Sequence, residues 1–184
     1  MGTVNKYLIM INQEVLNTYF STIWRQKNET IDRFQFSGFN LIDKIQLGER
    51  VLDVGCGLNQ FTGNIPNLIG IDPAFPEADF QTTLEDHARS NTAIRFNVIF
   101  CLESINFGSS DDIERQIQLL VQLLRRKSQS RIYWRSSTHP FDDIEVYPWT
   151  FDEHVRLATL FNFEITEMEW DSNDTIYAEW VYKN

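Results

Sequence analysis

The chain has 184 residues, a length that favours one domain over two. Hydrophobic residues make up 42% of the chain and aromatic residues 14%, which is enough for a packed core and excludes a disordered protein as the prediction. The 26 acidic and 16 basic residues give a formal net charge of −10, which repels phosphate backbones, so no nucleic-acid partner is predicted.

Residues 1–48 are predicted to form a helical cover ahead of the core. Between positions 4 and 23, apolar residues recur every three or four positions, which is typical of an amphipathic helix. The members of this stripe include Val4, Leu8, Ile11, Val15, Tyr19 and Ile23. A second short helical pattern covers 39–45 and stops near Gly48.

After residue 48 the pattern changes to short apolar runs bounded by turn residues, which indicates strands buried on both faces, as in a parallel sheet. The strands expected from these runs lie at 50–54, 68–72, 78–82, 96–102 and 131–134, the third being the weakest. Two alternating segments, 163–170 and 175–182, flank a turn-rich stretch and predict a β-hairpin at the end of the chain.

A clear helix is predicted between the runs at 96–102 and 131–134. Ser110 or Asp111 can cap it, and Glu114 can close a capping box with Asp111. Its buried face would consist of Ile113, Ile117, Leu120, Val121 and Leu124. The cations of its last turn, placed to oppose the negative end of the macrodipole, would be Arg125, Arg126 and Lys127.

A second capping box, 150–153, opens a helix that runs to about Phe161. Strands that alternate with helices and end in a hairpin predict an α/β sandwich with a mostly parallel sheet, here of seven strands. Such sheets bind ligands at the carboxyl ends of their strands. The positions that this rule selects follow Val54, Ile71, Leu102 and Arg135.

The most specific motif is the glycine loop Asp53-Val54-Gly55-Cys56-Gly57, directly after the first predicted core strand. Glycine lets the backbone turn sharply and approach a ligand closely. The Asp53 carboxylate is expected to point into the cleft, where it can accept hydrogen bonds. Asp72 ends the next apolar run, and a carboxylate there can accept both hydroxyls of a ribose.

Together these residues resemble class I S-adenosylmethionine-dependent methyltransferases, through the strings VLDVGCGLNQF and NLIGIDPAF. The resemblance extends from about Arg50 to the C-terminus and includes NVIFCLES, RIYWRSS and the final hairpin. It implies a Rossmann-like three-layer sandwich and S-adenosylmethionine as cofactor. The cofactor-binding residues that it implies are Asp53, Gly55, Cys56, Gly57, Asn59, Asp72, Pro73, Leu84, Glu85 and Leu102.

The chain departs from the pattern of that family at several positions. Asn59 stands where a third glycine is common, and Thr83 stands where many members carry an acid near the adenine. Only residues 58–67 separate the loop from the second strand, and the next crossover, 73–77, is shorter still. We therefore expect abbreviated early crossover helices.

Two residues at the expected ligand edge are candidates for chemistry. Glu103 follows the third core strand and could bind the cofactor amine, hold the substrate or act as a base, although a solvated loop carboxylate is an equal alternative. His139 lies past the fourth core strand, and histidine is a residue type that suits a base, although histidines in surface loops are common. No His, Cys and carboxylate set has metal-ligand spacing, so no metal is predicted.

Three further residues are substrate candidates, because the N-terminal segment of related enzymes often covers the cofactor and substrate. Trp24 and Arg33 lie in or next to the connection after the first helix, where an arginine could hold a carboxylate. Tyr147 could belong to an aromatic lid, or it could pack the last helix onto the sheet.

The substrate is expected to be a small molecule, because the acidic chain also lacks the Asn/Asp-Pro-Pro-aromatic motif of amino-methylating DNA enzymes. The only basic cluster is attributed mainly to the helix terminus; it comprises Arg125, Arg126, Lys127, Arg131 and Arg135. Cys56 and Cys101 form no CxxC pair, residues 1–10 show no signal-peptide pattern, and no apolar run approaches about 20 residues. These features predict a reduced, cytoplasmic protein with no membrane partner.

Two alternatives to a methyltransferase stay open. The shortened crossovers, Asn59 and Thr83 also suit a non-catalytic interaction domain that retains the fold. A nicotinamide-dependent oxidoreductase would need GxGxxG, and Gln60 occupies the position of the last glycine.

Overall fold

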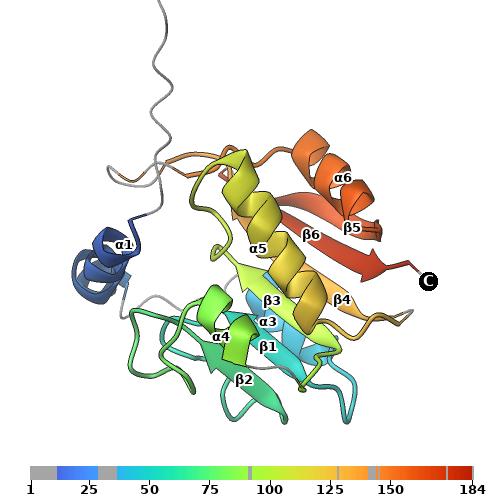
Figure 1. Cartoon of the computed structure of the whole chain (residues 1–184), viewed down its shortest axis with the longest axis horizontal. Helices are drawn as coiled ribbons and strands as arrows, with labels where there is room; N and C mark the ends of the chain where they lie inside the picture. The colour runs from blue at the N-terminus through green and yellow to red at the C-terminus, as the bar shows by residue number, and fades with distance from the viewer. Residues whose placement is uncertain are drawn as a thin grey trace, which may run out of the picture.

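A six-stranded sheet forms the centre of the fold, in the order β2-β1-β3-β4-β6-β5 (Figure 1). The strands are β1 Val51–Val54, β2 Leu68–Ile71, β3 Val98–Leu102, β4 Arg131–Ser137, β5 Phe163–Ser172 and β6 Thr175–Tyr182. The computed structural model describes residues 12–28, 37–90, 93–127, 129–140, 144, 146–172 and 174–183. β1 to β4 are parallel, and β6 runs antiparallel to both β4 and β5. The predicted parallel sheet with an antiparallel C-terminal hairpin is confirmed.

The predicted strand at 78–82 is wrong, and the sheet therefore has six strands rather than seven. Only Phe80 pairs there, through an isolated parallel bridge to Ile71. The Gly70 amide, which would have to continue the pairing, instead donates a hydrogen bond to the Asp79 carboxylate at 2.8 Å. Because a side-chain oxygen satisfies this amide, the ladder stops after one bridge.

Helices cover the two faces of the sheet unequally (Figure 1). The helices that pack on one face are α4 Leu84–Ser90, α5 Ser110–Leu123 and α6 Phe151–Leu160. The opposite face is covered by α3 Ser37–Asp43 together with the turns after β1. This gives the three layers expected from the sequence, with one thin layer.

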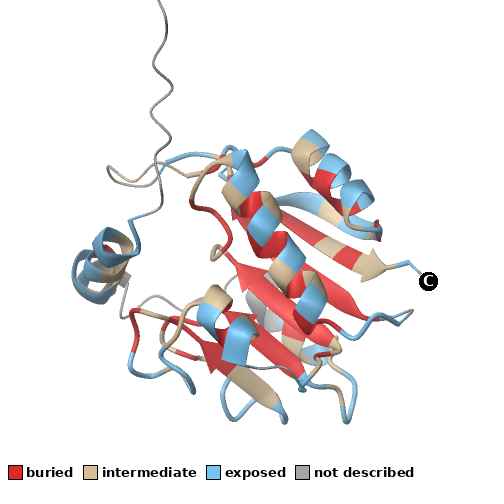
Figure 2. Ribbon diagram, viewed as in Figure 1, coloured by how far each residue is buried: buried red, intermediate tan, exposed pale blue. Residues whose placement is uncertain are grey.

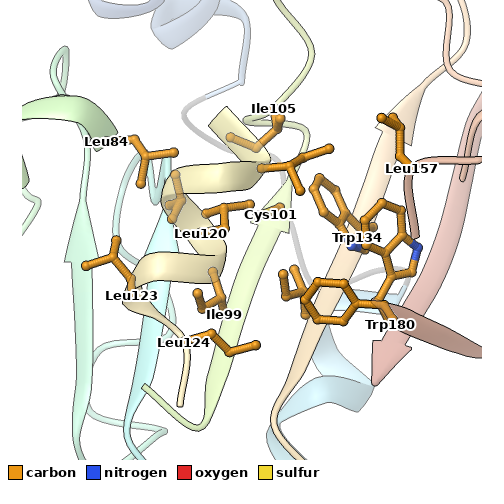
Figure 3. Packing of buried hydrophobic residues seen from close by; sticks show 14 of the residues in the cluster. Leu84, Ile99, Cys101, Ile105, Leu120, Leu123, Leu124, Trp134, Leu157 and Trp180 are labelled. Carbon is orange, nitrogen blue, oxygen red and sulfur yellow. The ribbon is translucent and has the colours of Figure 1, made fainter. Parts of the chain in front are cut away.

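Alternation along the strands divides the core into two clusters. In β3, Ile99 and Cys101 point towards α5, whereas Val98, Phe100 and Leu102 point towards α3. All five side chains are buried, and Figure 2 shows the central strands as a continuous buried layer. On the α5 side, Figure 3 shows the leucines of the helix packed over β3. The central strands are therefore covered on both faces, as parallel strands require.

The largest buried side chains gather where α6 packs on β4 and β6. The ring centroids of Trp134 and Trp180 lie 4.6 Å apart (Figure 3), and the rings of Trp149 and His154 lie 4.5 Å apart. His154 is completely buried, and neither ring nitrogen has a hydrogen-bond partner among the described residues. Burial lowers the pKa of His154 to about 3. His154 is thus a neutral core residue at physiological pH.

Both predicted helix starts exist, but the details of α5 differ. Its N-cap is Ser109, which forms a capping box with Asp112, one residue before the earlier of the two predicted caps. Its last residue is Leu123, so the cations that follow are not in its last turn. For α6 the predicted cap, Thr150, is confirmed, since its side chain accepts from the Glu153 amide at 3.1 Å.

The N-terminal cover is mostly helical in its described residues, 12–28 and 37–48, and residues 44–48 form turns. The segments α1 Gln13–Tyr19, the π-helical turn η1 Phe20–Trp24, and α2 Arg25–Asn28 follow one another without a break. The predicted apolar stripe is wrong in part, because Val15 is 57% exposed and Ile23 is 49% exposed, while Tyr19 is buried. The earlier stripe members, Val4, Leu8 and Ile11, lie outside the described residues.

The early crossovers are abbreviated, as predicted. Residues 55–67, between β1 and β2, form turns and no helix. Between β2 and β3 the described residues contain one helix, α4, of seven residues. Since 78–82 is not a strand, this crossover spans 72–97, so the predicted crossover at 73–77 is wrong.

Candidate functional site

A pocket of about 510 Å³ lies at the carboxyl ends of β1, β2 and β3 and under the N-terminal helix. The chain leaves β1 towards β2 on one side and returns to β3 on the other, so this is the switch point of the sheet, where α/β folds bind ligands. The predicted site residues that line it are Trp24, Gly55, Gly57, Asp72, Pro73, Leu84, Glu85, Leu102, Glu103 and His139.

The glycine loop forms the floor of this pocket. Gly55 and Gly57 have positive φ angles of 67° and 55°, which L-residues with a side chain rarely adopt. The amides of Gly55 and Cys56 both donate to the carbonyl of Ile71, at 2.8 and 3.1 Å, so the loop is fixed to the end of β2. A Cβ on Gly55 would lie 2.4 Å from the Cβ of Ser104. Glycine is therefore required at position 55 by conformation and by space.

Asp72 ties the glycine loop to the turn after β2. One carboxylate oxygen accepts from the Gly57 amide at 3.1 Å, and the other accepts from the amides of Ala74 and Phe75 at 2.7 and 3.2 Å. The residue is 7% exposed and lines the pocket. Three backbone amides therefore hold the Asp72 carboxylate at the pocket surface, where it can also accept from a ligand.

Asn59 supports the loop from behind and does not line the pocket. It adopts a φ of 52°, a left-handed conformation that asparagine tolerates better than most residues. This explains how it replaces a glycine. Its side-chain amide donates to the Glu77 carbonyl at 3.1 Å, and its oxygen sits where a Cβ on Gly70 would be, at 2.5 Å. Asn59 and Gly70 are therefore matched in shape.

This matching gives a testable stability effect. Gly70→Ala is expected to destabilise the protein by about 1–3 kcal/mol, because the added methyl overlaps Asn59 and Cys56, whose sulfur would lie 2.9 Å away. Asn59→Gly should recover part of that loss in the double variant, since it removes one of the two clashes and suits the positive φ. Urea denaturation of the two single variants and the double variant measures the coupling between their effects on the free energy of unfolding. Fully additive effects would contradict the matching.

The pocket wall beyond β2 is formed by the start of α4. Thr82, Thr83, Leu84 and Glu85 line it. The Thr83 hydroxyl accepts from the Asp86 amide at 3.2 Å, so the threonine that stands in place of an acid serves as a helix cap. Glu85, two residues after that cap, gives this wall an acidic residue.

Glu103 and Ser104 follow β3 and face the glycine loop. Glu103 has a φ of 63°, an uncommon conformation for a non-glycine residue and one that occurs at functional sites. Its amide donates to the Arg135 carbonyl at 2.7 Å, and its carboxylate accepts from the Ser137 hydroxyl at 3.5 Å. The buried Ser104 hydroxyl has no hydrogen-bond partner among the described residues. A polar ligand could satisfy it.

His139 lies at the mouth of the pocket. Its side chain is 68% exposed, its Nδ1 lies 2.8 Å from the Thr138 hydroxyl and 3.6 Å from the Asp174 carboxylate. Asp174, from the turn between β5 and β6, and Thr175, the first residue of β6, line the same pocket. The structure therefore brings both predicted catalytic candidates to one pocket.

An aromatic wall, which the sequence interpretation largely missed, closes the pocket from the N-terminal side. Its lining members are Tyr19, Phe20, Trp24, Phe75 and Phe107. Phe20 packs on Phe107 and Trp24 packs on Phe75, with ring centroids 5.7 and 5.8 Å apart. Phe75 directly follows the Asp-Pro-Ala of the second motif. Its place beside that motif is the one feature of the sequence that indicates part of the aromatic wall. The other contacts join segments distant in sequence.

Arg25 fixes the helical cover to the rest of the pocket. Its guanidinium forms an ion pair with Glu77 and lies 5.7 Å from the centre of the Phe75 ring. The hydrogen bond from Arg25 lowers the pKa of Glu77. Arg33, the other arginine of this connection, lies outside the described residues.

Besides Asn59, three predicted site residues among those described do not line the pocket. Asp53 lies within β1 and is 3% exposed, on the strand face opposite to Leu52 and Val54. Cys56 is 2% exposed and packs behind the loop. Tyr147 is buried in the core, hydrogen-bonded to Glu153, which corresponds to the packing alternative rather than to a lid. The expected direction of the Asp53 carboxylate, into the cleft, is not observed.

Within the described parts of the chain, no group of three or more His, Cys, Asp or Glu residues lies close enough to hold a metal ion. The same residues include no helix long and apolar enough to cross a membrane.

No family model and no curated protein matches the chain. Solved structures match over most of its length. Magnesium protoporphyrin IX methyltransferase from Synechocystis, with bound SAM, is 15% identical, with a TM-score of 0.67 over 95% of this chain and 98% of that chain. 1,6-Didemethyltoxoflavin-N1-methyltransferase from Burkholderia thailandensis, with its substrate and S-adenosylhomocysteine, is 14% identical, with a TM-score of 0.66 over 94% and 89%.

N-methyltransferase NodS from Bradyrhizobium japonicum, in complex with S-adenosylhomocysteine, is 15% identical, with a TM-score of 0.61 over 91% of this chain and 100% of that chain. At these identities the likeness establishes the fold. The chain has the fold of class I S-adenosylmethionine-dependent methyltransferases.

Proposed function

We propose that this protein is an S-adenosylmethionine-dependent methyltransferase that acts on a small molecule. The observation that carries the proposal is the meeting of the glycine loop, Asp72 and Glu103 around one pocket at the switch point of the sheet. The solved structures that share the fold include methyltransferases with S-adenosylmethionine or S-adenosylhomocysteine bound, which supports the same cofactor here.

The pocket residues fit this cofactor. Gly55 and Gly57, whose positive φ angles favour glycine, place no side chain over the pocket floor. The Ser104 hydroxyl, which has no hydrogen-bond partner among the described residues, and the Glu103 carboxylate offer polar contacts for an amino-acid group. The Asp72 carboxylate, which lines the pocket, can accept from ribose hydroxyls. Leu84 and Phe75 supply apolar surface beside them, as the flat base of a nucleoside requires.

When bound, S-adenosylmethionine supplies a methyl group on a sulfonium cation. The chain contributes alignment, charge and exclusion of water. Asp72, Glu85, Glu103 and Asp174 give the pocket a negative lining that favours a cation. Glu103, held in its left-handed conformation, is proposed to hold the acceptor or take its proton, with His139 as the second candidate for that proton.

The size of the pocket favours a small acceptor. Its whole volume of about 510 Å³, within the range of small-molecule sites of roughly 300–1,000 Å³, must hold the cofactor as well as the acceptor. The aromatic wall and the ion pair between Arg25 and Glu77 place the helical cover over the pocket, which restricts access by a large acceptor. Of the three predicted substrate residues, Trp24 belongs to that wall and is part of the proposal. Arg33 lies outside the described residues and Tyr147 is buried in the core, so neither is supported as a substrate contact. The predicted cytoplasmic location stays part of this proposal.

Transfer of labelled methyl groups tests the proposal. The full chain is incubated with methyl-labelled S-adenosylmethionine and the low-mass fraction of a cell extract. Label should enter small molecules in a protein-dependent way, and excess S-adenosylhomocysteine should suppress it. Glu103→Gln should lower the transfer rate while binding of S-adenosylhomocysteine is retained. Cofactor binding without any transfer of label would favour the alternative, a non-catalytic domain that retains the fold.

A further inference from the structure

Five cations surround a second pocket, at the edge of the sheet opposite the glycine loop. The pocket has a volume of about 660 Å³. Its cations are Arg50, Arg95, Arg125, Arg126 and Lys127. The other described residues that line it are Ala88, Ala93, Gln122, Leu123 and Leu124, and none of the ten is acidic. A purely basic pocket is unexpected in a chain with a net charge of −10.

Backbone hydrogen bonds hold the segments that carry these cations together. The Asn97 amide donates to the Arg50 carbonyl at 2.9 Å, which joins the segments that enter β1 and β3. The Phe96 amide donates to the Leu123 carbonyl at 2.9 Å, and the Arg125 amide donates to the Phe96 carbonyl at 2.7 Å. The end of α5 is thereby fixed beside the entry to β3. The convergence of the cations is a property of the fold and not of one charged stretch of sequence.

In the described parts of the chain, carboxylates do not account for four of these five charges. Among the described residues, no carboxylate forms an ion pair with Arg50, Arg125, Arg126 or Lys127. The two other cations of the sequence cluster face elsewhere, since Arg131 pairs with Glu49 and Arg135 with Asp171, both at 2.7 Å. The macrodipole of α5 is equivalent to about half a negative charge at the end of the helix. It therefore balances only a small part of the positive charge of these four cations.

We propose that this pocket binds the phosphate groups of a compact, multiply charged anion. Four of the five cations are arginines, whose planar guanidinium groups pair with phosphate oxygens through two parallel hydrogen bonds. The site is one pocket and not a stripe. Outside its five cations the chain carries a formal charge of −15, which would repel a long nucleic acid beyond the pocket. A small polyphosphate contacts only the favourable region.

Calorimetry with sodium tripolyphosphate and the full chain tests this site. The double variant Arg125→Gln/Arg126→Gln should weaken binding by about tenfold or more, because it removes two of the charge-assisted contacts. The matched control is Arg89→Gln/Arg115→Gln, which removes the same charge from two exposed arginines that already pair with Asp86 and Asp112. The control should bind tripolyphosphate as the parent does. Unchanged thermal midpoints establish that both variants fold.

Three results would overturn the proposal. One is the absence of saturable tripolyphosphate binding to the parent protein. Another is an equal loss of affinity in the two double variants, which would indicate a response to overall charge. The third is tighter binding of a single-stranded oligonucleotide than of tripolyphosphate, which would assign the surface to nucleic acid instead.

Discussion

Asp72→Ala is expected to weaken S-adenosylhomocysteine binding by an order of magnitude or more. Charge-assisted hydrogen bonds to ribose hydroxyls contribute roughly 1.5–3 kcal/mol, and the carboxylate that would make them lines the pocket. The same change should destabilise the protein by about 2–4 kcal/mol, because the amides of Gly57, Ala74 and Phe75 lose their shared acceptor. Calorimetry gives the first effect and urea denaturation gives the second.

Asp79→Ala is the matched control for Asp72. Its carboxylate accepts from the Gly70 amide at 2.8 Å and from the Asn59 side chain at 3.4 Å, but it does not line the pocket. The control should lose stability and, under conditions where it is folded, keep its affinity for S-adenosylhomocysteine. Equal affinities for Asp72→Ala and the parent, both folded, would remove Asp72 from the proposed cofactor site.

The second large effect concerns acid stability. Burial lowers the pKa of His154 from its ordinary 6.5 to about 3 in the folded protein. Between these two values the unfolded chain binds a proton that the folded chain does not, so stability falls as the pH falls below about 6.5. The loss approaches about 1.4 kcal/mol per pH unit for this group and ends near the folded pKa.

His154→Leu should remove most of that dependence. The variant should be as stable as the parent at neutral pH, because it also removes two ring nitrogens without hydrogen-bond partners among the described residues. A smaller slope should persist, in part from His87, whose pKa is also lowered by burial. Urea denaturation between pH 7.5 and 4.5, in roughly half-unit steps, measures the difference. Parallel pH profiles for parent and variant would contradict the assignment.

The sequence predicts the parallel strands well because their signal is local. Short apolar runs broken by glycine, asparagine or proline coincide with β1, β2 and β3 within about two residues. The strand expected at 78–82 fails for a non-local reason, since the Asp79 carboxylate takes the Gly70 amide that the strand would need. A side-chain competitor of this kind leaves no periodic mark in the sequence.

The loop and Asp72 could be predicted from motif and strand order, whereas side-chain direction could not. Alternation places Asp53 opposite Leu52 and Val54, yet nothing in the sequence tells which face of β1 opens to the pocket. The aromatic wall depends on contacts such as Trp24 with Phe75, which join distant segments. The basic pocket cannot be predicted from the sequence either, because only the fold brings Arg50 and Arg125 together.

The central claim is that the pocket at the glycine loop binds S-adenosylmethionine. The most direct measurement is a calorimetric titration of the full chain with S-adenosylhomocysteine, beside a parallel titration with nicotinamide adenine dinucleotide. The predicted result is saturable one-to-one heat with S-adenosylhomocysteine and none with the dinucleotide. Absence of heat with S-adenosylhomocysteine on demonstrably folded protein, or saturable binding of the dinucleotide in its place, would contradict the account.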